Sequence, residues 1–368
     1  MEPIRVLHMI GSLEIGGSQA MIMNIYRNID REKIQFDFVI DKNRGGFFEK
    51  EITELGGKIY KMPSFKGTNI HEIRKSWDVF FTEHPEYKIL HSHVRSYASL
   101  YIPIAKKHGV KTIIHSHSTS NGSGISALVK AVMQYPLRYQ ADYFFGCSQK
   151  SGEWLFGKKI VSGDRFFVIK NAIKTDEYKV DGNVRNQYRK ELGIEENAIV
   201  YVHVGRLHEA KNHMFLLELF AGIVKKNPKD VLLLVGDGEL RNQIVEKINE
   251  LDLSRNVIMM GARKDVANIL KASDCFLFPS NWEGLPVTVV EAQAAGLPCL
   301  ISDRITDEVN ITSLVKKLPI DQGTKCWIDA IENANLKKQD VIRQICEAGF
   351  DIKQSTELLQ NFYEEIYV

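Results

Sequence analysis

The 368-residue sequence has few cysteines, no long apolar run and little net charge. Its five cysteines are scattered and form no Cys-x-x-Cys pair, which argues against a disulfide framework or a zinc site and favours reduced thiols. No apolar segment approaches the ~20 residues of a membrane-spanning helix, and the first residues lack the basic start of a secretory signal. The sequence therefore predicts a cytoplasmic protein.

Composition excludes disorder, collagen and a coiled coil as the main architecture, because 44% of residues are hydrophobic and 26% are charged. The length predicts two domains. Residues 1–170 hold 24 Lys and Arg against 16 Asp and Glu, a balance of +8, whereas residues 171–368 hold 24 against 30, a balance of −6. This asymmetry suggests two domains with different partners, with chance and solvated faces as an equally weighted alternative.

Short apolar strands alternate with amphipathic helices, which is typical of α/β domains with a parallel sheet covered on both faces. The alternation stops at the polar residues 170–186 and then restarts. We therefore expect two doubly wound Rossmann-like domains, 1–172 and 173–350. A C-terminal helix, 351–368, is expected to return to the first domain, and only helices are expected after Ser302. The expected strands are 4–10, 36–40, 88–92, 111–115, 143–147, 166–169, 199–204, 231–235, 257–260, 275–278 and 299–302.

Glycine follows the first strand of each series, as a pair in the first and singly in the second. Gly16 and Gly17 precede a helix, where free N–H groups can face an anion, although a plain tight turn explains them equally well. In the second series, Gly205 is followed by Arg206 and Lys211 before the next helix. Two cations beside a helix N-terminus form a clamp suited to a diphosphate. Solvated loop cations are the alternative.

Two carboxylates follow the strand 275–278 with the spacing Glu-x7-Glu. Glu283 lies in a loop, and Glu291 lies on a helix that is expected to begin near Pro286. Two acids beside a phosphate site would repel the ligand unless they accept hydrogen bonds from its neutral hydroxyl groups. The flanking Gly, Pro and small residues favour this interpretation over a solvated pair of glutamates.

Five ordered blocks resemble the donor-binding half of retaining glycosyltransferases of family 4, which have the GT-B fold. The first half matches more loosely, and the closest resemblance is to bacterial capsule and exopolysaccharide transferases. The five blocks are Val204-Gly205-Arg206-Leu207 with Lys211, Leu234-Val235-Gly236-Asp237-Gly238, Phe278-Pro279-Ser280-x-x-Glu283-Gly284-Leu285-Pro286, Glu291-Ala292 and Ala295-Gly296-Leu297-Pro298. The looser matches are Gly16-Gly17, His91-Ser92-His93, His117 and Ile169-Lys170-Asn171-Ala172.

The resemblance implies that domain 1–172 binds the acceptor and that domain 173–350 binds the nucleotide-sugar donor. It also implies a role for each matching residue. Arg206 and Lys211 would hold the nucleotide diphosphate, and Glu291 would bind the ribose. Glu283 and His117 would lie beside the transferred sugar, with His115, two residues earlier on the same strand face, as the alternative to His117. The remaining residues implied in donor binding are Gly16, Gly17, Gly205, Arg263 (beside the base), Gly284, Leu285, Val287 and Thr288.

Two segments depart from the family pattern. Asp303-Arg304-Ile305-Thr306-Asp307-Glu308 stands where members often carry Gly-Gly-x-Pro-Glu, and Asn171-Ala172 replaces Asn-Gly. Because of the first difference, the resemblance does not assign the residues that would bind the sugar in this segment. No Asp-x-Asp motif occurs, so we expect no metal site and no cofactor besides the nucleotide-sugar co-substrate. His8, His203 and His213 are interpreted as core or surface residues rather than ligands.

The expected activity is transfer of a hexose from a nucleotide-sugar, with UDP as the expected nucleotide, to a saccharide or lipid-linked acceptor with retention of configuration. A GT-B nucleotide-sugar epimerase and a non-catalytic sugar-nucleotide-binding protein remain as alternatives. A dinucleotide oxidoreductase is disfavoured because neither glycine loop has the G-x-G-x-x-G spacing. Nucleic acid is not expected as a partner. The basic first domain suggests peripheral association with the anionic inner face of the cell membrane, through helices 97–108 and 126–139.

Overall fold

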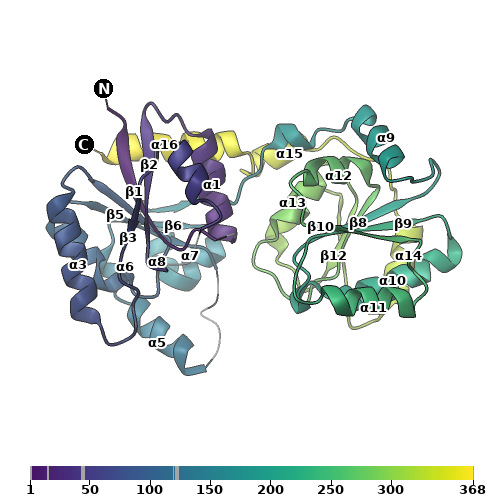
Figure 1. Cartoon of the computed structure of the whole chain (residues 1–368), viewed down its shortest axis with the longest axis horizontal. Coiled ribbons are helices and arrows are strands. Elements are labelled where there is room, and N and C mark those ends of the chain that lie inside the picture. The colour runs from purple at the N-terminus through teal and green to yellow at the C-terminus, as the bar shows by residue number, and fades with distance from the viewer. Residues whose placement is uncertain (1, 15, 43–45, 119, 121–123, 368) are drawn as a thin grey trace. The chain divides into compact units, whose positions relative to one another are not determined.

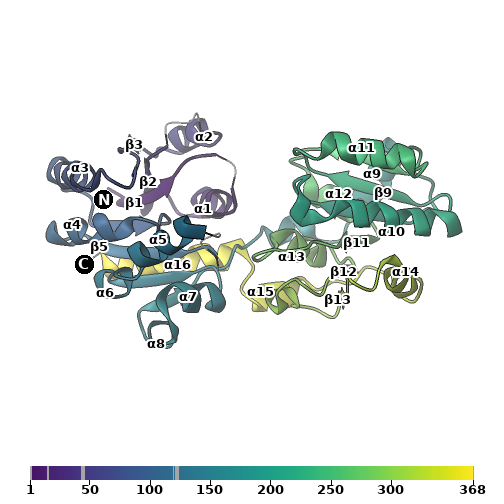
Figure 2. The same ribbon diagram turned by 90° about the horizontal axis from the view of Figure 1, so that it is seen from below.

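The computed structural model describes residues 2–14, 16–42, 46–118, 120 and 124–367. The chain divides into a first unit, Met1–Ala172 with Ile352–Val368, and a second unit, Ile173–Asp351. Within each unit, helices cover both faces of one parallel sheet (Figures 1 and 2). This arrangement confirms the two Rossmann-like units expected from the alternation of strands and helices.

The described part of the first unit has a seven-stranded sheet in the order β3-β2-β1-β4-β5-β6-β7. Its central strands are buried on both faces, which explains their nearly continuous apolar sequences. The sequence did not predict β3, which is too short to show a periodicity. The strands are β1 (Ile4–Gly11), β2 (Ile34–Ile40), β3 (Ile59–Lys61), β4 (Ile89–Ser92), β5 (Lys111–Ser116), β6 (Tyr143–Gly146) and β7 (Phe166–Val168).

The last helix of the chain, α16 (Ile352–Ile366), packs against α1 (Gly17–Asn28) within the first unit, as Figure 2 shows. Its buried side includes Leu359, Phe362 and Ile366, whereas Leu358 is 46% exposed. The other helices of this unit are α2 (Glu49–Glu54), α3 (Ile70–Glu83), α4 (Ile102–Lys107), α5 (Gly124–Gln134), α6 (Leu137–Gln140), α7 (Gln149–Phe156) and α8 (Lys158–Val161).

The helix expected at 126–139 is interrupted, because α5 ends at Gln134 and α6 begins at Leu137. Pro136 lies between them, and a proline removes a backbone donor and clashes with the preceding turn. The helical periodicity of the sequence continues across this break. The helices α7 and α8, which connect β6 to β7, were not predicted.

The described part of the second unit has a six-stranded sheet in the order β10-β9-β8-β11-β12-β13. The last strand, β13, was not predicted, so the expectation of helices alone after Ser302 was wrong. Its sequence Val-Lys-Lys-Leu lacks the apolar run of the inner strands because β13 is an edge strand. The strands are β8 (Val200–Val204), β9 (Val231–Val235), β10 (Val257–Gly261), β11 (Cys275–Phe278), β12 (Cys299–Ser302) and β13 (Val315–Leu318).

Helices of the second unit pack on both faces of this sheet around two apolar clusters (Figure 1). Gly349 lies just beyond the end of α15, and its φ of +77° is the left-handed conformation with which helices often end. The helices are α9 (Gly182–Glu191), α10 (His213–Lys226), α11 (Arg241–Glu250), α12 (Val266–Ala272), α13 (Val287–Ala294), α14 (Thr324–Glu332) and α15 (Ile342–Glu347). Among the described residues, no helix is both long and apolar enough to cross a membrane.

Candidate active site

The strand order of the second unit reverses at β8, which pairs with β9 on one side and β11 on the other. Ligands of open parallel sheets bind at the carboxyl edge at such a point. Residues 205–212 leave this edge after β8, and residues 279–286 leave it after β11. The diphosphate clamp and the first carboxylate predicted from the sequence lie in these two loops.

Lys211 and Glu283 form an ion pair between these loops. The Nζ atom of Lys211 lies 2.7 Å from Oε1 of Glu283, and each side chain is only 15% exposed. The same Nζ lies 4.6 Å from the centre of the Phe278 ring. Low exposure reduces solvent screening, so this pair is stronger than a surface ion pair. The structure thus holds one cation in a defined position at the carboxyl edge of the sheet of the second unit.

Arg206 lies on the same loop but outside this ion pair. Its side chain is 72% exposed, and Nη2 lies 3.2 Å from Oε2 of Glu239, in the loop after β9. His208 also approaches Glu239, with 3.5 Å between Nε2 and Oε1. An exposed ion pair contributes little free energy, so Arg206 can exchange Glu239 for a bound phosphate at small cost.

The glycines of the loop after β9 are required by a close backbone contact. Gly236 has φ of +136°, and a Cβ atom there would lie 2.0 Å from the carbonyl oxygen of Gly205. A Cβ atom on Gly238 would lie 2.5 Å from the carbonyl oxygen of Leu207, whose N–H donates to the Asp237 carbonyl at 3.0 Å. These contacts fix the position of the loop that carries Arg206 and Lys211.

The N-terminus of α13 lies directly after the Glu283 loop. Pro286 precedes its first residue, and no side chain caps it. Leu285, Val287 and Thr288 are partly exposed, and within the described residues the buried hydroxyl of Thr288 has no hydrogen-bond partner. A helix N-terminus without a cap offers N–H groups to an anion. Gly284 is exposed, and a Cβ atom there would meet no other atom within 4 Å.

Glu291 lies one turn further along α13, and the Tyr178 hydroxyl donates to its carboxylate. Burial raises the pKa of Glu291, and the hydrogen bond from Tyr178 opposes this shift. Sequence reasoning missed Tyr178, which lies far away in the chain. A partly buried carboxylate fixed on one side by a tyrosine can accept hydrogen bonds from a ligand on the other side.

Arg263 follows β10 at the same edge of the sheet. Its guanidinium donates to both carboxylate oxygens of Asp265, at 2.7 and 2.5 Å. This pairing and a hydrogen bond from Tyr188 lower the pKa of Asp265. Arg263 is thus paired with a carboxylate two residues away, and its role stays a prediction.

The first unit carries the other predicted residues, Gly16, Gly17 and His117. Gly16 is the N-cap of α1, which has no side-chain cap and no acidic residue in its first turn. His117 follows the last residue of β5, whereas His115 lies within that strand and is fully buried. Of the two candidate histidines, His117 is therefore the one at the carboxyl edge of the sheet.

Five histidines, on or directly after β1, β4 and β5, form a largely buried cluster that was not predicted as a unit. The Nδ1 of His93 lies 2.8 Å from Nε2 of His117, and Nδ1 of His8 lies 3.1 Å from Nε2 of His93. Nε2 of His91 lies 3.2 Å from Nδ1 of His115, and Nδ1 of His91 lies 2.6 Å from the Tyr363 hydroxyl.

Burial lowers the pKa of all five imidazoles, to about 3 for His8 and His117. Ring nitrogens of His93, His115 and His117 lie within 4.8 Å of one another, close enough to share a metal ion. The hydrogen bonds between the rings already pair most of these nitrogens, so we interpret the cluster as a neutral hydrogen-bonded stack. The expectation of no metal site stays a prediction.

Comparisons with known proteins agree with this geometry. Residues 15–177 match the family model described as Glycosyltransferase Family 4, and residues 184–332 match the model described as Glycosyl transferases group 1. EpsF of Bacillus subtilis (strain 168), assigned as a glycosyltransferase, is 31% identical over 98% of this chain and 96% of its own. The chain is a glycosyltransferase of family 4. The resemblance identified from the sequence motifs is thereby confirmed.

Two further relatives and one solved structure are similar to this glycosyltransferase. The capsular polysaccharide biosynthesis glycosyltransferase CapH of Staphylococcus aureus is 22% identical over 98% of both chains. The UDP-Gal:alpha-D-GlcNAc-diphosphoundecaprenol alpha-1,3-galactosyltransferase of Escherichia coli is 29% identical over 59% of this chain and 58% of its own. The crystal structure of Anabaena Alr3699/HepE in complex with UDP has a TM-score of 0.78, 17% identity, and coverage of 98% of this chain and 100% of that chain. This likeness confirms the GT-B fold.

Proposed function

We propose that this glycosyltransferase transfers a hexose from a UDP-sugar to a lipid-linked saccharide, with retention of configuration and without a metal ion, in the assembly of an extracellular polysaccharide. The Lys211–Glu283 ion pair beside the uncapped N-terminus of α13 is the observation that carries this proposal. The UDP complex of HepE, the galactosyltransferase of Escherichia coli and CapH support the nucleotide, the acceptor and the pathway class.

Each side chain has a defined task in this reaction. Lys211, Arg206 and the first N–H groups of α13 bind the diphosphate and stabilise the negative charge that grows on it as the glycosidic bond breaks. Glu291 binds the ribose hydroxyls, and Arg263 borders the base. Glu283 and His117 orient the transferred sugar on which oxocarbenium character develops. No side chain is assigned as a covalent nucleophile, and donor and acceptor react on the same face of the sugar.

The test is incubation of the purified protein with a panel of nucleotide-sugars, with and without a prenyl-diphosphate sugar acceptor. The proposal expects UDP to be released at a rate that depends on acceptor, and the proton NMR coupling of the product to show the anomeric configuration of the donor. An inverted product would refute retention. Isomerisation of the donor without acceptor would identify an epimerase, and binding without either reaction would identify a sugar-nucleotide-binding protein.

The two carboxylates of the second unit are expected to differ in what they do. Glu291→Gln should weaken UDP binding by roughly 10-fold, because ribose contacts are equally strong in the ground and transition states. Glu283→Gln should instead lower kcat by at least ~10²-fold and relax the choice of sugar, with little change in UDP affinity. Calorimetric titration with UDP and steady-state kinetics measure these effects, with Glu347→Gln on the exposed face of α15 as control. Equal losses of UDP affinity in both variants would contradict the assignment.

Membrane association is proposed through α5 alone. Its apolar side chains Ile125, Leu128 and Val132 are 83%, 67% and 66% exposed. The other helix named from the sequence does not expose such a face: Ile102, Ile104 and Ala105 of α4 are buried, and Lys106 and Lys107 pair with Asp142 and Asp78. An exposed apolar helix face in a basic unit is typical of binding at a membrane interface.

Flotation with vesicles tests this proposal. We expect the protein to float with anionic vesicles at low salt and less at high salt, since each basic residue near the surface adds about 1 kcal/mol. Leu128→Glu with Val132→Glu should abolish flotation, whereas Val245→Glu, at a 40% exposed position of α11, should not. Absence of binding at low salt would refute the proposal.

A further inference from the structure

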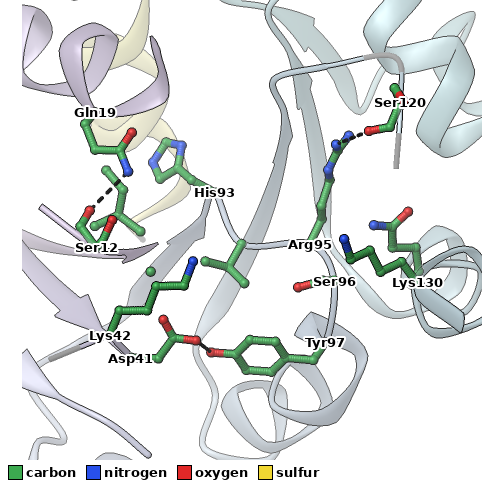
Figure 3. A pocket seen from close by; sticks show the side chains of 14 residues that line it. Ser12, Gln19, Asp41, Lys42, His93, Arg95, Ser96, Tyr97, Ser120 and Lys130 are labelled. Atoms are coloured by element: carbon green, nitrogen blue, oxygen red, sulfur yellow. Dashed lines mark hydrogen bonds between the residues drawn. The ribbon is translucent and has the colours of Figure 1, made fainter. Parts of the chain in front are cut away.

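A pocket of about 330 Å³ lies in the first unit, at the carboxyl ends of β1, β2 and β4 and beside α5 (Figure 3). Strand order reverses here as well, because β1 pairs with β2 on one side and β4 on the other. The side chains that decide its chemistry are Asp41, Lys42, His93, Arg95, Tyr97 and Lys130. A volume of this size suits a small polar ligand.

Arg95 has only neutral partners among the described residues. Its guanidinium donates to the Ser118 carbonyl at 3.0 Å, the Ser118 hydroxyl at 2.6 Å and the Ser120 carbonyl at 2.9 Å, and lies 4.8 Å from the Trp154 ring. Burial lowers the pKa of this guanidinium. A partly buried cation without a carboxylate partner is unfavourable unless a ligand supplies the negative charge.

Two lysines add to the positive charge. Lys42 and Lys130 extend toward the pocket from opposite sides in Figure 3, and neither forms an ion pair within the described part of the chain. Asp41 is the one carboxylate among the residues that line the pocket. The pocket therefore carries three cationic side chains against one carboxylate, a balance that attracts an anion.

Asp41 gives the pocket a second recognition element. Its Oδ2 accepts a hydrogen bond from the Tyr97 hydroxyl at 2.5 Å, while the buried Oδ1 has no partner among the described residues. Such an oxygen is satisfied by a donor on a ligand, and a sugar hydroxyl supplies one. The pocket also reaches His93, which is hydrogen-bonded to His117.

We propose that this pocket binds the acceptor through a phosphate or diphosphate group, held by Arg95, Lys130 and Lys42, while Asp41 accepts a hydrogen bond from a hydroxyl of the acceptor sugar. The inference rests on the proposed transferase function and names the chemistry of its acceptor. Lys130 lies on α5, whose exposed apolar side chains can accompany a lipid chain that leaves the phosphate. The Arg95 N–H groups that do not donate to Ser118 or Ser120 can contact a phosphate oxygen, and the two lysines act as point charges.

The experiment compares three acceptors with the same sugar: a prenyl diphosphate, a water-soluble 1-phosphate and a neutral alkyl glycoside. Lys130→Met, Lys42→Met and Arg95→Lys are each expected to raise KM for the phosphorylated acceptors by roughly 10- to 100-fold, as expected for loss of a charge-assisted contact. KM for the neutral glycoside and the affinity for UDP should stay within about 3-fold of the original. Lys50→Met, at an exposed position of α2, serves as the control.

Each outcome decides the inference. If the protein uses both the 1-phosphate and the prenyl diphosphate, the inference is supported and the phosphate group alone is recognised. If it uses only the prenyl diphosphate, the inference is supported and the recognised phosphate belongs to a lipid carrier. Equal changes for the charged and neutral acceptors, or no change for either, overturn it. Binding of the prenyl diphosphate acceptor is also measured by calorimetry in the absence of donor. If the protein fails to bind any UDP-sugar, the proposed function is refuted. The acceptor titration still shows whether the pocket binds the phosphate group.

Discussion

Replacing Lys211 with methionine is expected to reduce kcat by 10²- to 10³-fold, or ~2.7–4 kcal/mol, the usual effect of removing one electrostatic contact to the leaving group. Methionine keeps the alkyl chain that packs against Gly205 and removes only the charge. The Lys211→Met change also leaves Glu283 without its cation. Glu283→Gln in the Lys211→Met background therefore shows how much of the loss comes from an unpaired carboxylate.

Arg206 is more exposed than Lys211, but it is expected to contribute to turnover by a similar amount. Arg206→Ala is expected to lower kcat by a similar factor, and Arg206→Lys should not restore it, because lysine cannot form a bidentate contact to phosphate. The Arg206→Ala and Lys211→Met losses should be less than additive, since both residues act on one diphosphate. Arg343→Ala, at a 90% exposed arginine of α15, serves as control. Near-normal turnover of Arg206→Ala would contradict its role.

The same kinetics decide whether the clamp works without a metal. Two protein cations at the diphosphate need no ion to balance its charge, so turnover of the purified protein in excess EDTA should equal that without EDTA. Loss of activity in EDTA that returns with magnesium or manganese would refute the metal-free clamp. This result is independent of the acceptor, because UDP release by slow donor hydrolysis can be followed in the same way.

Much of the fold could be predicted from the sequence because inner parallel strands are apolar along their whole length. The bounds of β9, β11 and β12 match the predicted strands. The site loops could be placed for the same reason, since residues that follow parallel strands all emerge at one edge of the sheet. Lys211 and Glu283 are far apart in sequence, and they meet because β8 and β11 are neighbours.

Contacts that depend on strand order and side-chain direction could not be predicted in this way. The repeated His-Ser-His of residues 91–93 and 115–117 indicates that each pair faces one side of its strand. That these pairs stack, and that His8 joins them, follows only when β4 is known to lie between β1 and β5. The partners Glu239 and Tyr178 were missed because nothing local distinguishes them from other acidic or aromatic residues.

The histidine cluster predicts that the first unit loses stability in mild acid. His8 is fully buried and its pKa is lowered to about 3, whereas an unfolded histidine titrates near 6.5. Between these values the unfolded state binds more protons, so the free energy of unfolding falls as pH decreases below 6.5. From pH 7 to pH 5, one such imidazole costs about 2 kcal/mol.

The other four histidines of the cluster shift in the same direction, so their costs add to that of His8. Two imidazoles with this behaviour cost about 4 kcal/mol at pH 5, and a typical domain is stable by only about 5–15 kcal/mol. The urea midpoint, followed by circular dichroism, should therefore be markedly lower at pH 5 than at pH 7. His8→Gln should reduce this dependence on pH, since glutamine cannot take up a proton, whereas His71→Gln at an exposed position of α3 should leave it unchanged. Equal midpoints of the unsubstituted protein at pH 7 and pH 5 would show that these imidazoles do not lie neutral and buried in the folded protein.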